Sequence, residues 1–239
     1  MKKNLLAASA LVAATLALST SVAQAEDKLP GKFSGTVGMT SDYVFRGVSQ
    51  TNEDAAFQAS IDWAHDSGVY AGIWGSNVNF GSGKNSKSNA GDLETDVYAG
   101  YKGKVDAFTY NLGGIYYVYP GASSNLDYDY FELTVGGAYD FGIASVSAAV
   151  NYSPDFFGTA DDTAWYYTAG VSVPLGQYFS ASANIGHQNL DTSKDYTDWN
   201  VGVAATYDSF TLGLKYVDTN LHNNTLANDR YVVSLSRAF

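Results

Sequence analysis

Charged side chains inside strand-like segments are the first candidates for chemistry in this sequence. Where apolar and polar residues alternate, the polar row carries few ionisable groups: Asp62, Glu94, Asp96, Glu132, Asp198, Lys215 and Arg230. If these rows line an enclosed lumen, opposed charges at a constriction tune the selectivity of a pore. The same charges also suit an internal salt-bridge network that braces the wall and closes the lumen. Both interpretations stay open at the level of sequence.

Arg46 is the candidate residue outside the strands, because it follows Tyr43 and Phe45 and precedes Gly47 in the first long connection. In one interpretation this connection folds inward, and Arg46 forms a binding point for anions or carboxylates at the mouth of a lumen. In the other, Arg46 pairs with an acidic loop residue or stacks on Tyr43. We favour the second role, because an arginine in the loops of an acidic protein usually finds a carboxylate.

Other segments that resemble catalytic or ligand-binding motifs do not complete them. Residues 81–84 (Gly-Ser-Gly-Lys) resemble part of a phosphate-binding loop, but Asn85 replaces the required Ser or Thr and Val78 replaces the first glycine. The histidines have no metal-ligand spacing and no obvious nucleophile with an orienting acid: they are His65, His187 and His222. We therefore predict that the protein is not an enzyme and needs no cofactor or metal.

The elements that must position these residues follow from the spacing of the breaks between them. Between residues 32 and 239 the chain contains about twelve strand-like runs, joined by connections that are alternately long and short. The long connections lie near 42–53, 79–91, 119–126, 154–161, 190–195 and 218–228, and the short ones near 65–67, 103–106, 140–142, 175–177 and 208–209. Tight periplasmic turns and long extracellular loops are typical of outer-membrane barrels. We predict an all-β fold, a transmembrane antiparallel up-and-down barrel of about twelve strands.

Alternation within each run predicts which residues face lipid. In one late strand the apolar row is Phe210, Leu212, Leu214 and Tyr216, and the polar row is Thr211, Gly213 and Lys215. Aromatic residues flank both kinds of connection, which predicts two interfacial girdles. Those near the short turns are Trp63, Tyr101, Phe108, Tyr139, Phe141, Phe179, Tyr207 and Phe210; those near the long loops are Tyr43, Phe45, Tyr116, Tyr119, Tyr128, Phe156, Trp165 and Trp199. The register of residues 69–80 stays open, because aromatic residues occur on both of its rows.

Both ends of the chain carry signals of export. Residues 1–25 combine Lys2 and Lys3, an apolar stretch over 5–18 and an Ala-Gln-Ala site at 23–25, which predicts a cleaved signal peptide and a barrel domain over 26–239. The alternating row that ends in Phe239 resembles the signal that the barrel assembly machinery binds. Arg237 departs from that pattern, and we expect its head group to snorkel at the interface.

The composition excludes some partners and favours others. The net charge of −11 argues against nucleic acid, because phosphate binding needs clustered Lys and Arg. The absence of cysteine indicates a fold that needs no disulfide in an oxidising compartment. We expect outer-membrane lipid and lipopolysaccharide, the assembly machinery, and small polar solutes or ions as partners. The acidic field favours cations and neutral solutes over anions.

Several segments resemble a known family. Residues 41–51 (SDYVFRGVSQT) resemble the hallmark segment of the TorF family of outer-membrane porins. Residues 68–78 (GVYAGIWGSNV) and 96–101 (DVYAGY) are similar to its following blocks, and 116–121 (YYVYPG) comes next in the same order. The resemblance implies a single-domain outer-membrane barrel that is assigned as a porin largely by architecture. The family supplies no agreed substrate and no established site residues.

The expected function is therefore a porin-like channel in the bacterial outer membrane. A barrel of about twelve strands lies between the filled eight-stranded barrels and the wide sixteen-stranded porins, so we expect a narrow lumen for passive diffusion. The alternative is a closed structural or adhesive barrel that binds partners through its extracellular loops. The permeant, the pore diameter and the oligomeric state do not follow from the sequence.

Overall fold

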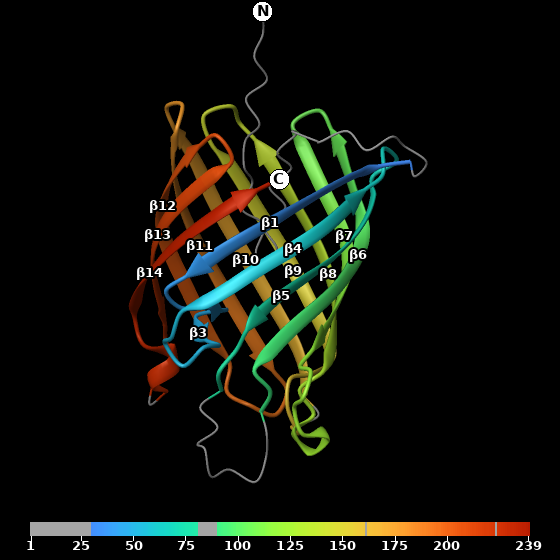
Figure 1. The fold of residues 1–239 in the computed structure, drawn as a ribbon, viewed down its shortest axis with the longest axis vertical. Helices are drawn as coiled ribbons and strands as arrows, with labels where there is room; N and C mark the ends of the chain where they lie inside the picture. The colour runs from blue at the N-terminus through green and yellow to red at the C-terminus, as the bar shows by residue number, and fades with distance from the viewer. Residues whose placement is uncertain (1–29, 81–89, 161, 223) are drawn as a thin grey trace, which may run out of the picture.

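The computed structural model describes residues 30–80, 90–160, 162–222 and 224–239. Over these residues twelve antiparallel strands close into one barrel in chain order, with β1 paired to both β14 and β4 (Figure 1). The prediction of an all-β antiparallel barrel is confirmed. The predicted signal peptide, residues 1–25, lies outside the described residues and stays a prediction.

The strands are nine to fourteen residues long, which suits a tilted crossing of a bilayer. Their bounds are β1 (Lys32–Thr40), β4 (Ala56–Ala64), β5 (Val69–Asn77), β6 (Leu93–Val105), β7 (Phe108–Val118), β8 (Tyr130–Asp140), β9 (Ser145–Phe156), β10 (Asp162–Leu175), β11 (Phe179–Leu190), β12 (Tyr196–Tyr207), β13 (Phe210–Thr219) and β14 (Arg230–Ala238). Two further strands, β2 (Val44–Phe45) and β3 (Val48–Ser49), form a separate hairpin, and two short 3-10 helices are η1 (Ser124–Leu126) and η2 (Thr225–Ala227).

The connections alternate in length as predicted. The short turns lie together at one end of the barrel with the C-terminus, and the long connections lie at the other (Figure 1). The turn between β12 and β13 needs only Asp208 and Ser209, and Asp208 takes the positive φ of a tight hairpin turn. We call these two ends the short-turn end and the long-loop end.

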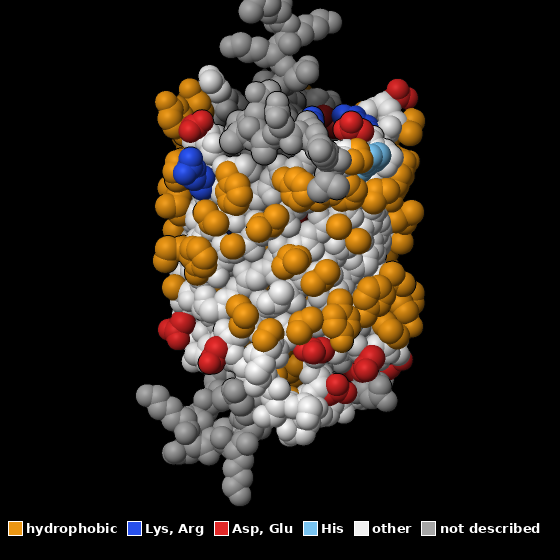
Figure 2. Space-filling model, turned by 45° about the vertical axis from the view of Figure 1, so that its right-hand side comes forward, with side chains coloured by type: hydrophobic (Ala, Val, Ile, Leu, Met, Phe, Trp, Pro, Cys, Tyr) orange, Lys and Arg blue, Asp and Glu red, His pale blue; other side chains and the backbone are white. Residues whose placement is uncertain are grey.

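The outer surface of the barrel is apolar between its two rims. Alternate side chains along each strand point outward and remain exposed, among them Ile61 at 63% and Leu212 at 53%. Figure 2 shows apolar side chains over the middle of the face in view and charged side chains confined to its two rims. A water-soluble surface does not carry so large an apolar patch, whereas a lipid-facing barrel requires one. The described residues therefore form a β-barrel that spans a membrane.

No helix in the described ranges has the length and the apolar composition needed to cross a membrane.

Strand β5 settles the register that the sequence left open. Val69 and Ile73 are exposed on the outer face, whereas Tyr70 and Trp74 point into the barrel. The Tyr70 hydroxyl crosses the inner wall to donate a hydrogen bond to Asn111 Oδ1 on β7, at 2.9 Å. The aromatic residues of this strand therefore lie on the lumen side, where the small inner side chains of its neighbours leave room.

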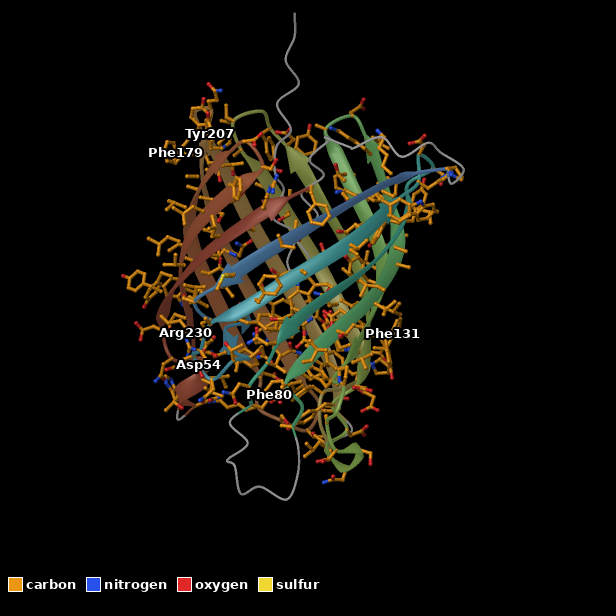
Figure 3. All side chains as sticks on the ribbon, viewed as in Figure 1. Asp54, Phe80, Phe131, Phe179, Tyr207 and Arg230 are labelled. Carbon is orange, nitrogen blue, oxygen red and sulfur yellow. The ribbon has the colours of Figure 1, made fainter. Side chains whose placement is uncertain are left out.

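The two predicted aromatic girdles have different outcomes. At the short-turn end, the prediction is confirmed by exposed side chains such as Tyr207, Phe179 and Phe141, and Figure 3 shows Phe179 and Tyr207 at that rim. At the long-loop end, Tyr116, Trp165 and Trp199 are exposed as predicted. The prediction was wrong for the other five, which pack in or against the buried aromatic cluster of the mouth: Tyr43, Phe45, Tyr119, Tyr128 and Phe156.

The C-terminus closes the barrel. Phe239 exchanges two backbone hydrogen bonds of 3.0 Å with Gly35 beside the seam between β14 and β1. Arg237 lies on the outer row at the short-turn rim, and its guanidinium sits over the Phe210 ring at 5.3 Å from the centroid. This position agrees with the expectation that Arg237 reaches the interface.

Candidate functional site: a constriction across the lumen

The first long connection folds into the barrel and crosses it. Strands β2 and β3 pair at its centre, joined by Arg46 and Gly47, whose φ values of 46° and 81° describe a tight hairpin turn. A Cβ added to Gly47 would overlap the side chains of Thr219 and Asp198, so the hairpin tip rests directly on the wall formed by β12 and β13. We call residues 41–55 the inward loop.

Arg46 reaches the wall opposite the strands that carry the inward loop. Its Nη2 donates to Glu132 Oε2 on β8 at 2.5 Å, and its Nη1 donates to Gln188 Oε1 on β11 at 2.8 Å. The guanidinium carbon lies 4.2 Å from the centroid of the Tyr166 ring and 4.7 Å from that of Phe45. Arg46 is 6% exposed, so this network is shielded from solvent.

The charge on Arg46 is secured by its partners. Burial is the largest single influence and lowers the pKa of the guanidinium, but the attraction and hydrogen bond of Glu132 together with the nearby Tyr117 and Tyr130 hydroxyls outweigh it and leave the pKa of Arg46 raised. A non-glycine residue in the left-handed region costs roughly 1 kcal/mol or more, and such positions persist where the surroundings hold them. The ion pair and the two ring contacts offset that strain at Arg46.

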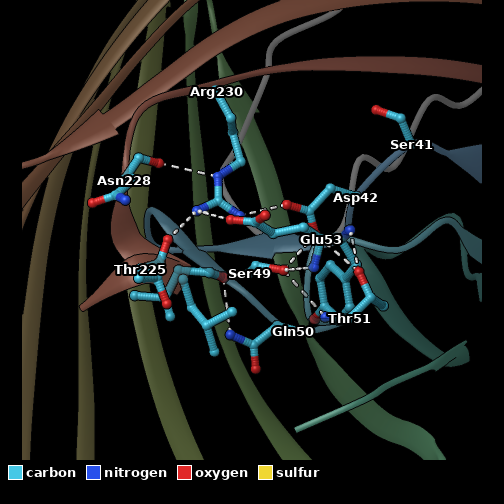
Figure 4. Close-up of polar contacts among 12 residues, drawn as sticks. Ser41, Asp42, Ser49, Gln50, Thr51, Glu53, Thr225, Asn228 and Arg230 are labelled. Atoms are coloured by element: carbon cyan, nitrogen blue, oxygen red, sulfur yellow. Dashed lines mark hydrogen bonds and ion pairs between the residues drawn. The ribbon is translucent and has the colours of Figure 1, made fainter. Parts of the chain in front are cut away.

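The base of the inward loop is fixed by a second arginine. Arg230 at the start of β14 donates from Nη1 to Asp42 Oδ2 at 2.7 Å, and its Nη2 lies 3.4 Å from Glu53 Oε1. Asp42 Oδ1 accepts hydrogen bonds from the hydroxyls of Ser49 at 2.6 Å and Thr51 at 2.9 Å. Figure 4 shows this cluster of contacts between the loop and the barrel wall. The loop is therefore held at its base and at its tip.

Tyrosines satisfy several of the inward carboxylates. Tyr43 of the inward loop donates to Glu94 Oε1 at 2.8 Å. Burial, followed by the nearby Glu94 charge, holds the pKa of Tyr43 well above its usual range, so its hydroxyl stays a donor. On the wall, the Tyr98 hydroxyl donates to Asp62, and the Tyr166 hydroxyl lies 3.0 Å from Asp198 Oδ2.

Aromatic rings fill the mouth beside the inward loop. Val78, Tyr117, Tyr119 and Tyr130 form a buried cluster, and Tyr117 stacks on Tyr130 with centroids 4.2 Å apart. Rings from four connections and strand ends pack around them: Tyr43, Phe45, Phe80, Tyr128, Phe156 and Phe157. Figure 3 places Phe80 at this end of the barrel. This cluster fills one part of the mouth. The hairpin tip lies in another part, against β12 and β13.

Below the inward loop the inner row carries Lys215. It lies at mid-length of β13, opposite Gly202 and Val232, and it retains solvent-accessible surface although protein surrounds it. Its inner-row neighbours Thr211 and Gly213 are small. Towards the short-turn end Lys102 and Lys104 are also on the inner row of β6 and exposed. The inner face of β6 therefore runs from the buried Glu94 and Asp96 near the long-loop end to the exposed Lys102 and Lys104 near the short-turn end.

The predicted site residues all lie inside the barrel, Arg46 on the inward loop and the others on the inner side of the wall, but they form several groups. Arg46 pairs with Glu132, Arg230 pairs with Asp42, and Glu94 is bound by Tyr43. Glu94 and Asp96 are neighbours on the inner face of β6. The remaining predicted residues belong to separate places on the wall, namely Asp62 on β4, Asp198 on β12 and Lys215 on β13.

Sequence reasoning missed two partners of the arginines. Gln188 is fully buried and accepts from Arg46, and Asp42 organises the base of the inward loop. A signal for Gln188 existed, since it is a long amide at the end of an inner row of small residues, Ser180, Ser182, Asn184 and Gly186. Asp42 had no such signal, because it lies outside the strands.

The arrangement suits binding and selection better than bond-making chemistry. Among the residues that the structure describes, no group of three or more His, Cys, Asp or Glu side chains is arranged to hold a metal ion. His187 is exposed on the outer row of β11, where its Nδ1 lies 2.9 Å from the Thr197 hydroxyl. His65 lies in a turn at the short-turn end, 2.7 Å from the Ser67 hydroxyl. Neither histidine faces the lumen.

Comparison with known proteins finds one matching family model and solved structures of similar fold. The family model Gcw_chp, described as "Bacterial protein of unknown function", matches residues 24–239. No curated protein sequence matches the chain. Among solved structures, the KdgM porin superposes with a TM-score of 0.56 at 13% identity, covering 87% of this chain and 98% of that one. The KdgM porin in complex with disordered oligogalacturonate gives a TM-score of 0.57, also at 13% identity, with the same coverage of 87% and 98%. At these identities the likeness shows a shared barrel fold.

Proposed function

This chain belongs to the Gcw_chp family of bacterial proteins, and we propose that it forms a narrow channel for passive diffusion of small polar solutes or ions across the outer membrane. The observation that carries the proposal is Lys215, an inner-row side chain at mid-barrel that is exposed to solvent within the lumen. An eight-stranded barrel fills this level with side chains, whereas here the inner-row residues beside Lys215 are the small Thr211, Gly213 and Gly202.

The inward loop sets the constriction of this channel. It places Arg46 between Glu132 and Gln188 across the full width of the lumen, so a solute must pass beside a fixed cation and several buried carboxylates. Charged groups at a narrow point select solutes by sign and size. The acidic net charge of the chain, −11, favours cations and neutral polar solutes over anions.

Two resemblances support the same class of function. The fold is that of the KdgM porin, a channel-forming barrel. The segment around Arg46 resembles the hallmark of the TorF family, so the residues that carry that resemblance are those that build the constriction. We also propose the expected partners: lipid and lipopolysaccharide around the barrel, and the assembly machinery at Phe239. We assign no enzymatic reaction to the protein.

A closed structural barrel is the second candidate, and the packing of the inward loop favours it. Arg46 is buried and the aromatic cluster fills the neighbouring part of the mouth. If this arrangement is permanent, the lumen is closed at the long-loop end, and the protein acts through partners that bind its extracellular loops.

Single-channel recording separates the two candidates. The refolded protein is inserted in a planar bilayer with a salt gradient across it. Discrete conductance steps with a reversal potential that indicates cation preference would support the selective channel. A protein that inserts, resists heat in detergent and never conducts would contradict the channel and favour the closed barrel.

A further inference from the structure

Several carboxylates on the inner side of the barrel have no cationic partner among the described residues. The buried ones include Asp42, Asp62, Glu94, Asp96, Glu132 and Asp198. Over the described part of the chain, ion pairs to arginine reach only Glu132, Asp42 and the more exposed Glu53. Asp62 and Asp198 instead accept hydrogen bonds from tyrosine hydroxyls. The wall of β6, which carries Glu94 and Asp96, therefore holds two buried carboxylates without a cationic partner among the described residues.

Asp96 has the clearest deficit. It is 5% exposed, and its Oδ1 atom has no hydrogen-bond partner among the described residues. Glu94 lies two residues away on the same face of β6, roughly 7 Å along the strand, and accepts from Tyr43 at 2.8 Å. Buried polar atoms are nearly always paired, and each exception calls for a specific explanation such as a missing ligand. The unpartnered oxygen points to a donor that the protein itself does not supply.

The neighbours of Asp96 are aromatic on both sides. In the sheet register Asp96 lies directly opposite Trp74 on β5 and opposite Tyr117 on β7. Trp74 also meets the ring of Tyr43 at 5.3 Å in an edge-to-face contact. Carboxylates together with aromatic faces recognise ammonium groups, because the carboxylate accepts charge-assisted hydrogen bonds and the rings attract the cation.

A divalent metal fits this place less well than an ammonium group does. Calcium takes six to eight oxygen ligands. Over the described ranges no cluster of three candidate ligand side chains exists, at Asp96 or elsewhere. A protonated amine needs only a few acceptors and tolerates aromatic neighbours, which Glu94, Asp96, Trp74 and Tyr117 supply.

We propose that Glu94 and Asp96 form a binding site in the lumen wall for the protonated amine of a small solute. The site rests on the proposed channel and names a class of solute for it: compact organic cations with a primary ammonium group. Such a solute would enter from the long-loop end beside the inward loop and meet the exposed lysines only after leaving the site.

The test compares three four-carbon probes that differ in charge: putrescine, 1,4-butanediol and succinate. Binding to the refolded full-length barrel in detergent is measured by titration calorimetry, without any need for conductance. We expect saturable binding of putrescine and none of butanediol or succinate. Asp96→Asn, which keeps the shape of the side chain, should weaken putrescine binding by about tenfold or more, because one charge-assisted hydrogen bond is lost. Glu94→Gln should weaken it as well.

Asp229→Asn is the matched control, since it removes the same charge from an exposed carboxylate at the long-loop rim that accepts from Tyr216. It should leave putrescine binding within about twofold, because rim charges are screened by salt. Heat-modifiable gel mobility verifies that every variant is folded. Equal binding by wild type and Asp96→Asn, or equal binding of putrescine and butanediol, would overturn the site and show that Asp96 is a neutral wall residue.

Conductance separates this inference from the proposed function. A barrel that conducts ions but does not bind putrescine leaves the channel standing and removes the amine site. A barrel that binds putrescine through Asp96 and never conducts retains the site and removes the channel.

Discussion

Replacing Arg46 with glutamine tests whether the inward loop is the constriction. The substitution removes the guanidinium that joins the hairpin tip to Glu132 on β8 and to Gln188 on β11. Glutamine is too short to reach both partners and carries no charge. The substitution leaves the backbone pairing of the barrel strands unchanged, so its effect is confined to the contacts of the hairpin tip with the wall.

The magnitude follows from the burial of the ion pair. Both side chains are almost fully buried, at 2% and 4% exposure. Removing one partner of a buried pair costs about 3–5 kcal/mol when the other charge stays buried. The loop can relieve part of this cost by leaving the lumen, so we take the lower end, about 3 kcal/mol, which lowers the ratio of seated to displaced hairpin by about 100-fold. The Asp42–Arg230 pair still holds the base of the loop.

The assay is single-channel recording of the refolded protein. Arg46→Gln should show a larger conductance level or a longer dwell time in it, because the displaced hairpin no longer crosses the lumen. Heat resistance in detergent should be unchanged, since the strand ladders are intact. Arg46→Lys should lie between wild type and Arg46→Gln, because one ammonium cannot serve two partners in the fork geometry of arginine.

Arg237→Gln is the control for Arg46→Gln. It makes the same replacement at an arginine on the outer row, over the Phe210 ring, and should not change conductance. Traces from folded Arg46→Gln that match those of wild type would refute the assignment of the hairpin as the constriction. An equal rise in both variants would refute the claim that the effect is local.

Further substitutions test the wall and the loop. Leu212→Arg should destabilise the barrel by about 2–4 kcal/mol, since it places a charge against lipid, whereas Thr211→Arg on the inner row should fold. Urea titration of the refolded protein measures the stability of both variants. Equal destabilisation would contradict the assignment of the two faces. Lys215→Gln should shift the reversal potential towards stronger cation preference, because it removes a cation from the lumen. An unchanged reversal potential would show that Lys215 does not face the permeation path. Gly47→Val should reproduce the enlarged conductance of Arg46→Gln, because its φ of 81° and its contact with the wall both exclude a branched side chain; normal conductance would mean that the tip is not seated as described.

The strand order, the faces and the lengths of the connections were predictable because each depends on local pattern. A strand that meets lipid on one side and water on the other must alternate with a period of two, as in Phe210 to Tyr216. The length of each turn likewise depends only on residues that are close in the sequence. The register of β5 was the exception, because the Tyr70 and Trp74 rings belong to the lumen and their apolar character misleads a rule based on alternation.

The aromatic residues near the long loops show a second limit. A ring beside a loop has two stable places, the headgroup layer or the interior of the mouth, and the sequence does not distinguish them. Trp199 is exposed on the outer surface, whereas Tyr119 is buried inside the mouth. The difference depends on whether the connecting loop turns inward, which is decided by contacts with other strands.

By itself the sequence predicted a barrel wall with a polar inner row, and it placed Arg46 in the first long loop next to that row. Only the tertiary structure decided what Arg46 does there. Its partners Glu132 and Gln188 are 86 and 142 residues away in the chain. They come within hydrogen-bond reach because the barrel closes, and closure fixes which strands stand opposite one another. A contact across a lumen is a property of the closed ring, and no local pattern encodes it.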